Sequence, residues 1–228
     1  NPGAERAAWL YALLCLLAII FLLGMQNASW QFALLLLAVI FWFFIAPFLL
    51  AKGMNLSLQK LRPFYVVLGL ILLPATWFAL VFLRELGLIF LLSTIAFVWV
   101  ADIGAYFVGK AFGKHKLAVQ ISPGKSVEGA IGGLILCYGY ALVCAFSLPF
   151  ESTLFGAWAI RFGWAPMFLM VTVLTAFSIF GDLFESQLKR LAGVKDSSHL
   201  LPGHGGVLDR VDALIPTMPI AALLAGLV

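Results

Sequence analysis

Residues 7–51 read AAWLYALLCLLAIIFLLGMQNASWQFALLLLAVIFWFFIAPFLLA and contain no Asp, Glu, Lys, Arg or His. A run of this length is enough for two membrane spans of roughly 20 residues each. Backbone groups inside a bilayer have no water to bind, so an isolated span must satisfy them as a helix. This stretch alone therefore predicts a membrane-embedded helical protein.

The rest of the chain continues the same pattern. Of its 228 residues, 64% are hydrophobic and only 11% are charged, against about a quarter charged in soluble domains. We predict an all-α, polytopic transmembrane fold with about seven spans, at residues 8–25, 31–50, 64–83, 88–108, 127–148, 165–188 and 207–228. Prolines in or beside these spans predict kinks, at Pro47, Pro74, Pro216 and Pro219.

The loops between the spans predict an orientation. With seven alternating spans, twelve of the fourteen Lys and Arg residues fall on the side of the N-terminus, and only Arg84 and Arg161 fall on the other. Because cytoplasmic loops carry the excess of Lys and Arg, the first side is predicted to be cytoplasmic. In a bacterium this would place the protein in the inner membrane.

Polar residues gather in two blocks, which both lie on that side. Residues 102–128 and 182–212 hold 15 of the 24 charged residues, seven of the ten acids and all three histidines. Topology requires the cations there, but it does not require the acids. We therefore interpret the two blocks as parts of one site, and we divide the chain into N-terminal transmembrane helices, 1–98, and a catalytic region, 99–228.

One stripe of a helix carries much of the second block. Asp182, Glu185, Ser186 and Lys189 are spaced i, i+3, i+4 and i+7, which places them on one helical face. Glu185 and Lys189 also suit an ordinary ion pair, with or without a catalytic role. Asp102 lies about 12 Å deeper in its span than Lys110, and such an acid is a functional candidate unless it only pairs with a neighbouring lysine.

The segment 201–212, LPGHGGVLDRVD, leads into the last span. Its glycines allow backbone N–H groups to approach an anion closely, and acids at the start of the span suit a hard cation that binds oxygen. We interpret the segment as a phosphate and magnesium site, while a simple re-entrant turn remains open. Lys114, His115 and Lys116 are open to two interpretations, as substrate ligands or as a topology anchor.

Several fixed polar positions in the second block carry a family resemblance. Residues 186–190 read SQLKR, 195–196 KD, 202–206 PGHGG and 209–212 DRVD, with His199 between them. Upstream, 101–106 read ADIGAY, 113–117 GKHKL and 122–125 SPGK. These residues resemble the signature of the phosphatidate cytidylyltransferases, from about residue 99 to the C-terminus. Members of that family carry additional N-terminal membrane segments, so we expect the chain to begin inside a longer protein.

The resemblance implies transfer of CMP from CTP to phosphatidate, which gives CDP-diacylglycerol and pyrophosphate. It implies Mg²⁺ as cofactor and leaves a second cation open. The residues that it implies for catalysis are Asp182, Asp209, Lys189, Arg190 and His204, with Asp182, Asp209 and Asp212 for the metal. Those that it implies for substrate binding are Lys110, Lys114, Lys125, Ser122, Ser186, Lys195, Asp196, His199, Arg210 and Asp102.

Two other functions remain as alternatives. Charged residues inside broken helices are also common in secondary transporters, although here the charges crowd one membrane face and no second half mirrors the first. A CTP-dependent lipid kinase would use a similar architecture. CTP and phosphatidate are the expected partners, no nucleic acid is expected, and a homodimer is left open.

Overall fold

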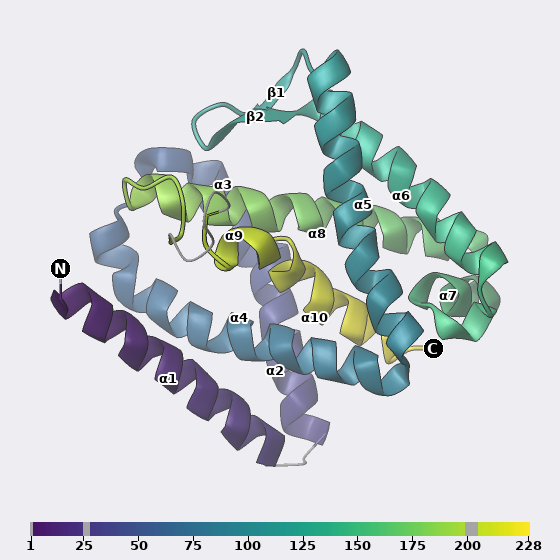
Figure 1. Cartoon of the computed structure of the whole chain (residues 1–228), viewed down its shortest axis with the longest axis horizontal. Coiled ribbons are helices and arrows are strands. Elements are labelled where there is room, and N and C mark those ends of the chain that lie inside the picture. Colours follow the sequence, from purple (N-terminus) through teal and green to yellow (C-terminus); the bar gives the residue numbers. More distant parts are fainter. Residues whose placement is uncertain (1, 25–27, 199–204) are drawn as a thin grey trace.

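The computed structural model describes residues 2–24, 28–198 and 205–228, and nearly all of its regular structure is helical (Figure 1). Its longer helices are α1 (Pro2–Gly24), α2 (Ala28–Ile40), α4 (Leu58–Leu86), α5 (Leu88–Phe112), α6 (Val127–Ser147), α8 (Trp164–Leu191) and α10 (Leu214–Ala225). Shorter elements are η1 (Phe41–Ile45), α3 (Ala46–Lys52), η2 (Gly53–Asn55), β1 (Lys116–Ala118), β2 (Ser122–Ser126), η3 (Phe150–Ser152), α7 (Leu154–Phe162) and α9 (Leu208–Val211). The predicted helical class is therefore confirmed.

Five helices in the described part of the chain are long and apolar enough to cross a membrane, namely Ser29–Asn55, Leu58–Leu86, Leu88–Phe112, Val127–Ser147 and Trp164–Leu191. These match the second to the sixth predicted spans. The first, α1, contains a shorter apolar stretch, Arg6–Leu22. The last is interrupted at Asp212 and Ala213, which leaves α10 with only 12 residues. The count of seven spans stays a prediction.

The prolines act in different ways. Pro47 follows a π-helical turn, η1, which ends two residues before it. A proline ring clashes with the carbonyl of the residue four positions earlier, Phe43, and the wider π turn accommodates that clash. Pro74 lies within the single long helix α4. Pro216 and Pro219 both lie in α10 and are buried.

Glycines allow α5 and α6 to approach closely. A Cβ atom on Gly132 would lie 2.4 Å from the Cβ of Val108, and one on Gly129 or Gly133 would lie 2.7 Å from a backbone carbonyl of α5. These distances are too short for any side chain, so the pair depends on glycine at all three positions. Small residues thus allow these two helices to pack closely.

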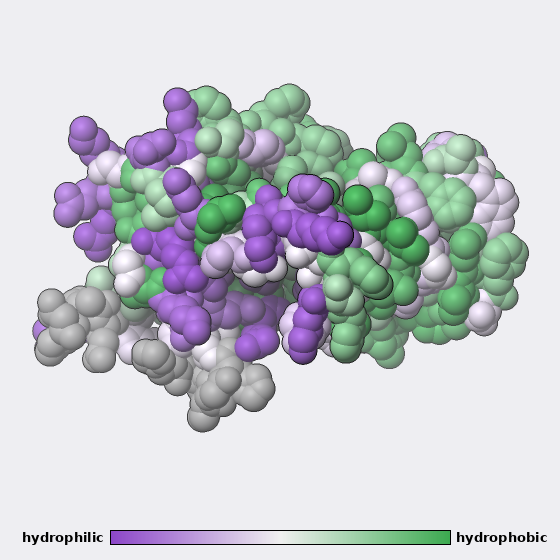
Figure 2. Space-filling view, turned by 90° about the horizontal axis from the view of Figure 1, so that it is seen from above, coloured by the Kyte–Doolittle hydropathy of each residue, from purple (hydrophilic) through white to green (hydrophobic). Residues whose placement is uncertain are grey.

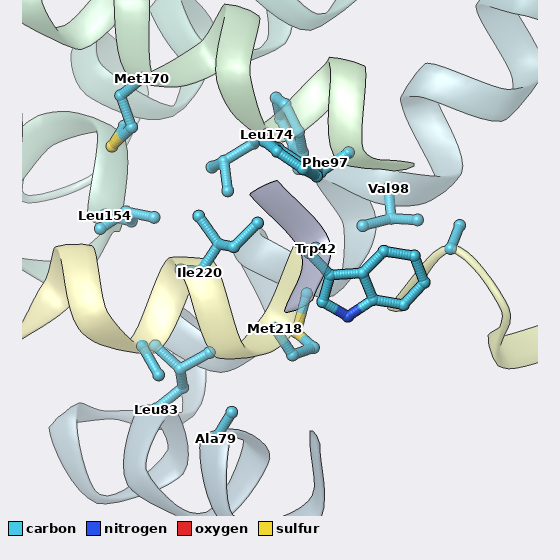
Figure 3. Close-up of a cluster of buried hydrophobic side chains, with 14 of the residues drawn as sticks. Trp42, Ala79, Leu83, Phe97, Val98, Leu154, Met170, Leu174, Met218 and Ile220 are labelled. Carbon is cyan, nitrogen blue, oxygen red and sulfur yellow. The ribbon is translucent and has the colours of Figure 1, made fainter. Parts of the chain in front are cut away.

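The core is formed around α10, which packs against α4, α8, α2 and α5. Figure 3 shows Met218 and Ile220 of α10 among Leu83 of α4, Phe97 of α5 and Leu174 of α8. Trp42 lies at one side of this cluster and is 1% exposed. Helices from both ends of the sequence therefore share one core.

An aromatic group joins the N-terminal helices to the helix that carries the polar stripe. The ring of Phe184 on α8 contacts the rings of Phe41, Trp42 and Tyr65, with centroids 5.5, 5.5 and 6.4 Å away. Edge-to-face pairs of this kind add about 0.5–1.5 kcal/mol each beyond the burial of their area. The turn η1 and the helix α4 thus pack directly against α8.

Two elements were not foreseen from the sequence. Residues 116–126 form a small antiparallel hairpin, β1–β2, between α5 and α6, and α7 follows α6 as a short amphipathic helix. In Figure 2, hydrophilic residues gather over one half of the visible face and hydrophobic ones over the other. Lys125, on β2 of the hairpin, forms a salt bridge with Asp182 of α8.

Candidate active site

The polar stripe of α8 forms as its spacing predicted. The hydroxyl of Ser186 donates to Oδ1 of Asp182 at 3.3 Å, and Lys189 forms a salt bridge with Glu185 one turn earlier. Glu185 is 5% exposed and Asp182 is half-buried. The predicted ion pair is confirmed, and its burial makes it a costly arrangement unless both charges stay paired.

The hairpin joins the two polar blocks. Nζ of Lys125, on β2, lies 2.6 Å from Oδ2 of Asp182. On the same side of α8, Nε of Arg190 donates to the backbone carbonyl of Ile121 at 3.5 Å. Residues that are some 60 positions apart in sequence therefore contribute to one site, as their shared membrane face suggested.

Asp209, on the short helix α9, is the most heavily bonded acid of the site. Its Oδ1 accepts from Nζ of Lys189 at 2.5 Å. Its Oδ2 accepts from the backbone N–H of Ser197 at 2.9 Å, from the hydroxyl of Ser197 at 2.7 Å and from the backbone N–H of Gly206 at 2.7 Å. Burial opposes ionisation, but these donors outweigh it and hold the pKa of Asp209 well below the usual range.

The backbone at Gly205 passes so close to Asp209 that only glycine fits at this position. Gly205 has a φ of 79°, which is in the left-handed region where other residues are strained. A Cβ there would also lie 2.9 Å from Oδ2 of Asp209. The backbone N–H of Gly206 donates to the carboxylate of Asp209, and the phosphate and magnesium site expected in this segment stays a prediction.

Asp102 and Asp212 complete an acidic inner surface. Asp102 lies within electrostatic range of Asp182 and Lys125, and Asp212 lies within range of Asp182, Glu185 and Asp102. Burial raises the pKa of Asp212 to about 7, and the neighbouring carboxylates add to that effect. Lys125 forms its salt bridge with Asp182, and no salt bridge of Asp102 is found in the part of the chain that the structure describes. The alternative that Asp102 only pairs with a neighbouring lysine is therefore not supported.

This acidic surface fits a hard cation in its chemistry, because carboxylate oxygens are the ligands that Mg²⁺ prefers. In the described residues, however, no three His, Cys, Asp or Glu side chains are close enough to hold a metal as they stand. The two acids that the sequence analysis favoured as metal ligands each form a salt bridge with a lysine, Asp182 with Lys125 and Asp209 with Lys189. A cation could bind these acids only after the lysines move.

The other predicted site residues divide into three groups. Ser122 is half-buried on β2. Lys110, Lys114, Lys195, Asp196 and Arg210 are exposed around the polar face. His199 and His204 lie outside the described residues, so their predicted roles stay predictions.

Sequence reasoning missed three contributors. The first is Ser197, whose two bonds to Asp209 have no clear sequence signal. The second is Glu128, whose carboxylate accepts from the backbone N–H groups of Lys114 and His115 at 3.1 Å and lies 2.5 Å from Nδ1 of His115. An acid at the start of a helix, just after a serine N-cap, was the available signal for that residue.

The third is Gln187, which is fully buried. Its Nε2 donates to the backbone carbonyls of Leu49 at 2.9 Å and Gly53 at 2.8 Å. These carbonyls lie at the end of α3, where helical partners run out. Gln187 thus links α8 to the C-terminal end of α3 by two hydrogen bonds.

Long apolar helices and a polar face that carries lysine–aspartate pairs define an integral membrane protein with a charged site. Comparison with known proteins agrees with this class. The model of the cytidylyltransferase family matches residues 2–228, and the chain belongs to that family.

Its relatives include several bacterial proteins named phosphatidate cytidylyltransferase. The one from Haemophilus influenzae is 54% identical over 136 residues, which are 58% of this chain and 44% of that protein. The one from Pseudomonas aeruginosa is 44% identical over 159 residues, 69% of this chain and 55% of that protein. The one from Bacillus subtilis is 40% identical over 149 residues, 64% and 50% of the two chains. The chain thus spans about half the length of the curated relatives it matches.

Proposed function

We propose that the protein transfers CMP from CTP to phosphatidate, giving CDP-diacylglycerol and pyrophosphate. The observation that carries this proposal is the pairing of Lys125 with Asp182 and of Lys189 with Asp209 in one membrane-borne site. Such paired charges can separate when polyphosphate enters, so that lysines meet phosphate and carboxylates meet a cation. The names of the relatives support the same activity and substrates.

The chemistry requires little proton transfer. A phosphomonoester has a second pKa near 6, so the phosphatidate oxygen is mostly ionised at neutral pH. That oxygen attacks the α-phosphorus of CTP, the new P–O bond forms, and the bond to the β-phosphate breaks in line to release pyrophosphate. The difficulty is electrostatic, because two polyanions must meet and the leaving group gains charge.

The chain's own cations answer that difficulty. Lys189 and Arg190 lie beside Asp209 and the hairpin, where they would bind the CTP phosphates together with Lys195 and His204. Lys110, Lys114 and Lys125 would bind phosphate from either substrate. Ser122, Ser186, Asp196, His199, Arg210 and Asp102 complete the proposed substrate contacts.

Asp182, Asp209 and Asp212 are the proposed ligands for Mg²⁺, with a second cation left open. When bound, the metal would neutralise the pyrophosphate as it leaves. The carboxylates fit this role by chemistry, and Asp212 lies within electrostatic range of Asp182. Asp209 would join them once Lys189 turns from its carboxylate to a phosphate.

The polar face would be cytoplasmic, which is the side on which CTP is found. This orientation rests on the distribution of Lys and Arg along the chain. Phosphatidate would reach the site sideways from the bilayer, since its acyl chains remain in hydrocarbon.

The experiment supplies the purified full-length protein with phosphatidate, Mg²⁺ and CTP labelled with ³²P at either the α- or the γ-phosphate. Cytidylyl transfer puts the α label into lipid and leaves the γ label in pyrophosphate. A lipid kinase would do the opposite and put the γ label into lipid. If neither labelled CTP gives labelled lipid, both enzyme functions are refuted. A secondary transporter would then be the remaining alternative.

A further inference from the structure

An exposed stripe runs along α5 from its first turns to Lys110 in its last turn. Leu92, Trp99, Ile103, Tyr106 and Lys110 are spaced by seven, four, three and four residues, so they share one side of the helix. The four apolar or aromatic members are 53–60% exposed. The opposite side of α5 is the one that packs against α6 through the glycine contacts.

The polar end of this stripe has a defined arrangement. Nζ of Lys110 lies 5.8 Å from the centre of the Tyr106 ring, within the range of a cation–π contact. Because Lys110 lies in the last turn of the apolar helix α5, its ammonium group would sit near the membrane boundary, where a lipid phosphate lies. Below it, Ile103 and Trp99 present an apolar surface at the depth of acyl chains.

The stripe also adjoins the candidate active site. Asp102 is exposed, precedes Ile103 directly and lies one helical turn from Tyr106. Its carboxylate is within electrostatic range of Asp182 and Lys125. A lipid phosphate at Lys110 would thus lie about 12 Å along α5 from Asp102 without leaving the bilayer.

We propose that the stripe formed by Leu92, Trp99, Ile103, Tyr106 and Lys110 is the docking surface for phosphatidate, with the phosphate at Lys110 and one acyl chain along Ile103 and Trp99. The charge of Lys110 and the apolar surface below it match a lipid with a small anionic head. This assignment rests on the proposed function and makes Tyr106 the residue that positions the lysine.

Kinetics in mixed micelles test the role of Tyr106. Tyr106→Ala removes the ring below the ammonium, so the KM for phosphatidate should rise about 3- to 30-fold, while the KM for CTP stays unchanged. Tyr106→Phe keeps the ring and should behave as wild type. Phe112→Ala is the matched control, because Phe112 is similarly exposed on α5 but faces α6. An unchanged KM in Tyr106→Ala, or an equal rise in Phe112→Ala, would overturn the assignment.

Fluorescence tests docking without catalysis. Vesicles of phosphatidylcholine receive equal amounts of either phosphatidate or phosphatidylcholine with brominated acyl chains, which quench nearby tryptophan. The contribution of Trp99 is the difference between wild type and Trp99→Phe. Stronger quenching of that contribution by brominated phosphatidate supports the docking surface, and equal quenching by both lipids reduces the stripe to an ordinary lipid contact. No CTP is present, so the result is independent of the proposed reaction.

Discussion

At the scale of single residues, Asp182 gives the clearest test of the proposed chemistry. Asp182→Asn keeps the size of the side chain and its bond to Ser186 but removes the charge that would hold a cation. We expect kcat to fall by more than tenfold, about 1.4 kcal/mol or more in the barrier, measured with labelled CTP. Glu85→Gln removes an exposed charge at the end of α4 and serves as the control that should retain full activity.

Asp209→Asn would be harder to interpret. Its Oδ2 accepts three hydrogen bonds, and an amide nitrogen in that place would face three donors. Loss of activity there would mix lost charge with a disturbed segment around Ser197 and Gly206. The substitution would also break the salt bridge with Lys189, so a lower melting temperature in detergent is expected from both effects. For the Asp182→Asn variant, in contrast, more than a tenth of the wild-type rate would reject the role of Asp182 as a metal ligand.

Lys189 and Lys110 test whether the site has separate nucleotide and lipid ends. Removing Lys189 should raise the KM for CTP or lower kcat, and Lys110→Ala should raise the KM for phosphatidate. One lost charge-assisted contact costs roughly 1.5–3 kcal/mol, about 10- to 100-fold in kcat/KM. Steady-state kinetics with each substrate varied in turn supply the measurement.

The design must respect the buried partner of Lys189. Lys189→Ala alone would leave Glu185 buried and unpaired, which destabilises a protein strongly. The comparison is therefore made in a Glu185→Gln background, with Lys189→Met added to it. Equal shifts of both KM values in the two lysine variants would show that the site has no separable ends.

At the scale of elements, the α5–α6 pair offers a prediction on stability. Gly132→Ala places a methyl group against Val108, where the space is already filled, and overpacking of this kind costs about 1–3 kcal/mol. Gly139→Ala is a matched control on the same helix, because nothing lies within 4 Å of its added Cβ. Thermal unfolding in detergent should show a lower melting temperature for Gly132→Ala alone. Equal melting temperatures would mean that the helices can separate at no cost.

The elements also show how far sequence reasoning reaches. The second to sixth spans were predicted well because the length and hydrophobicity of a span can be taken directly from apolar runs such as 31–50 and 165–188. The hairpin at 116–126 was missed because five of its residues read as a polar loop, and its pairing depends on the packing of α5 against α6. The last span was predicted as one helix, but the structure has a break at Asp212. The prediction missed this break because the only sequence signal for it is the polar residues nearby.

The candidate site was predicted only in part, because the sequence shows spacing along one helix but not contacts between distant segments. Spacing along α8 was sufficient for Asp182, Ser186 and Lys189, since helical periodicity alone places them together. Contacts between distant segments could not be derived from spacing, so the partner of Asp182, Lys125, and the role of Gln187 appeared only in three dimensions.

At the scale of the whole molecule, the orientation in the membrane can be measured directly. Single cysteines at Lys114 and Lys195, in a background without the three native cysteines, should react with a membrane-impermeant reagent only from the cytoplasmic side. A cysteine at Glu151, which is exposed near α7, should react only from the other side. The reverse pattern would place the polar face away from CTP and contradict the proposed reaction.

The candidate site holds more acids than bases in the described residues, because the acids Asp102, Asp182, Glu185, Asp209 and Asp212 lie near only three cations, Lys125, Lys189 and Arg190. Such a surface repels a bare nucleotide tetra-anion and admits it together with a counter-ion. The true substrate should therefore be the magnesium–nucleotide complex. Initial rates measured at fixed total CTP should follow the concentration of that complex, and excess metal-free CTP should compete only weakly. Strong inhibition by metal-free CTP would show that the surrounding cations, and not the inner acids, govern entry.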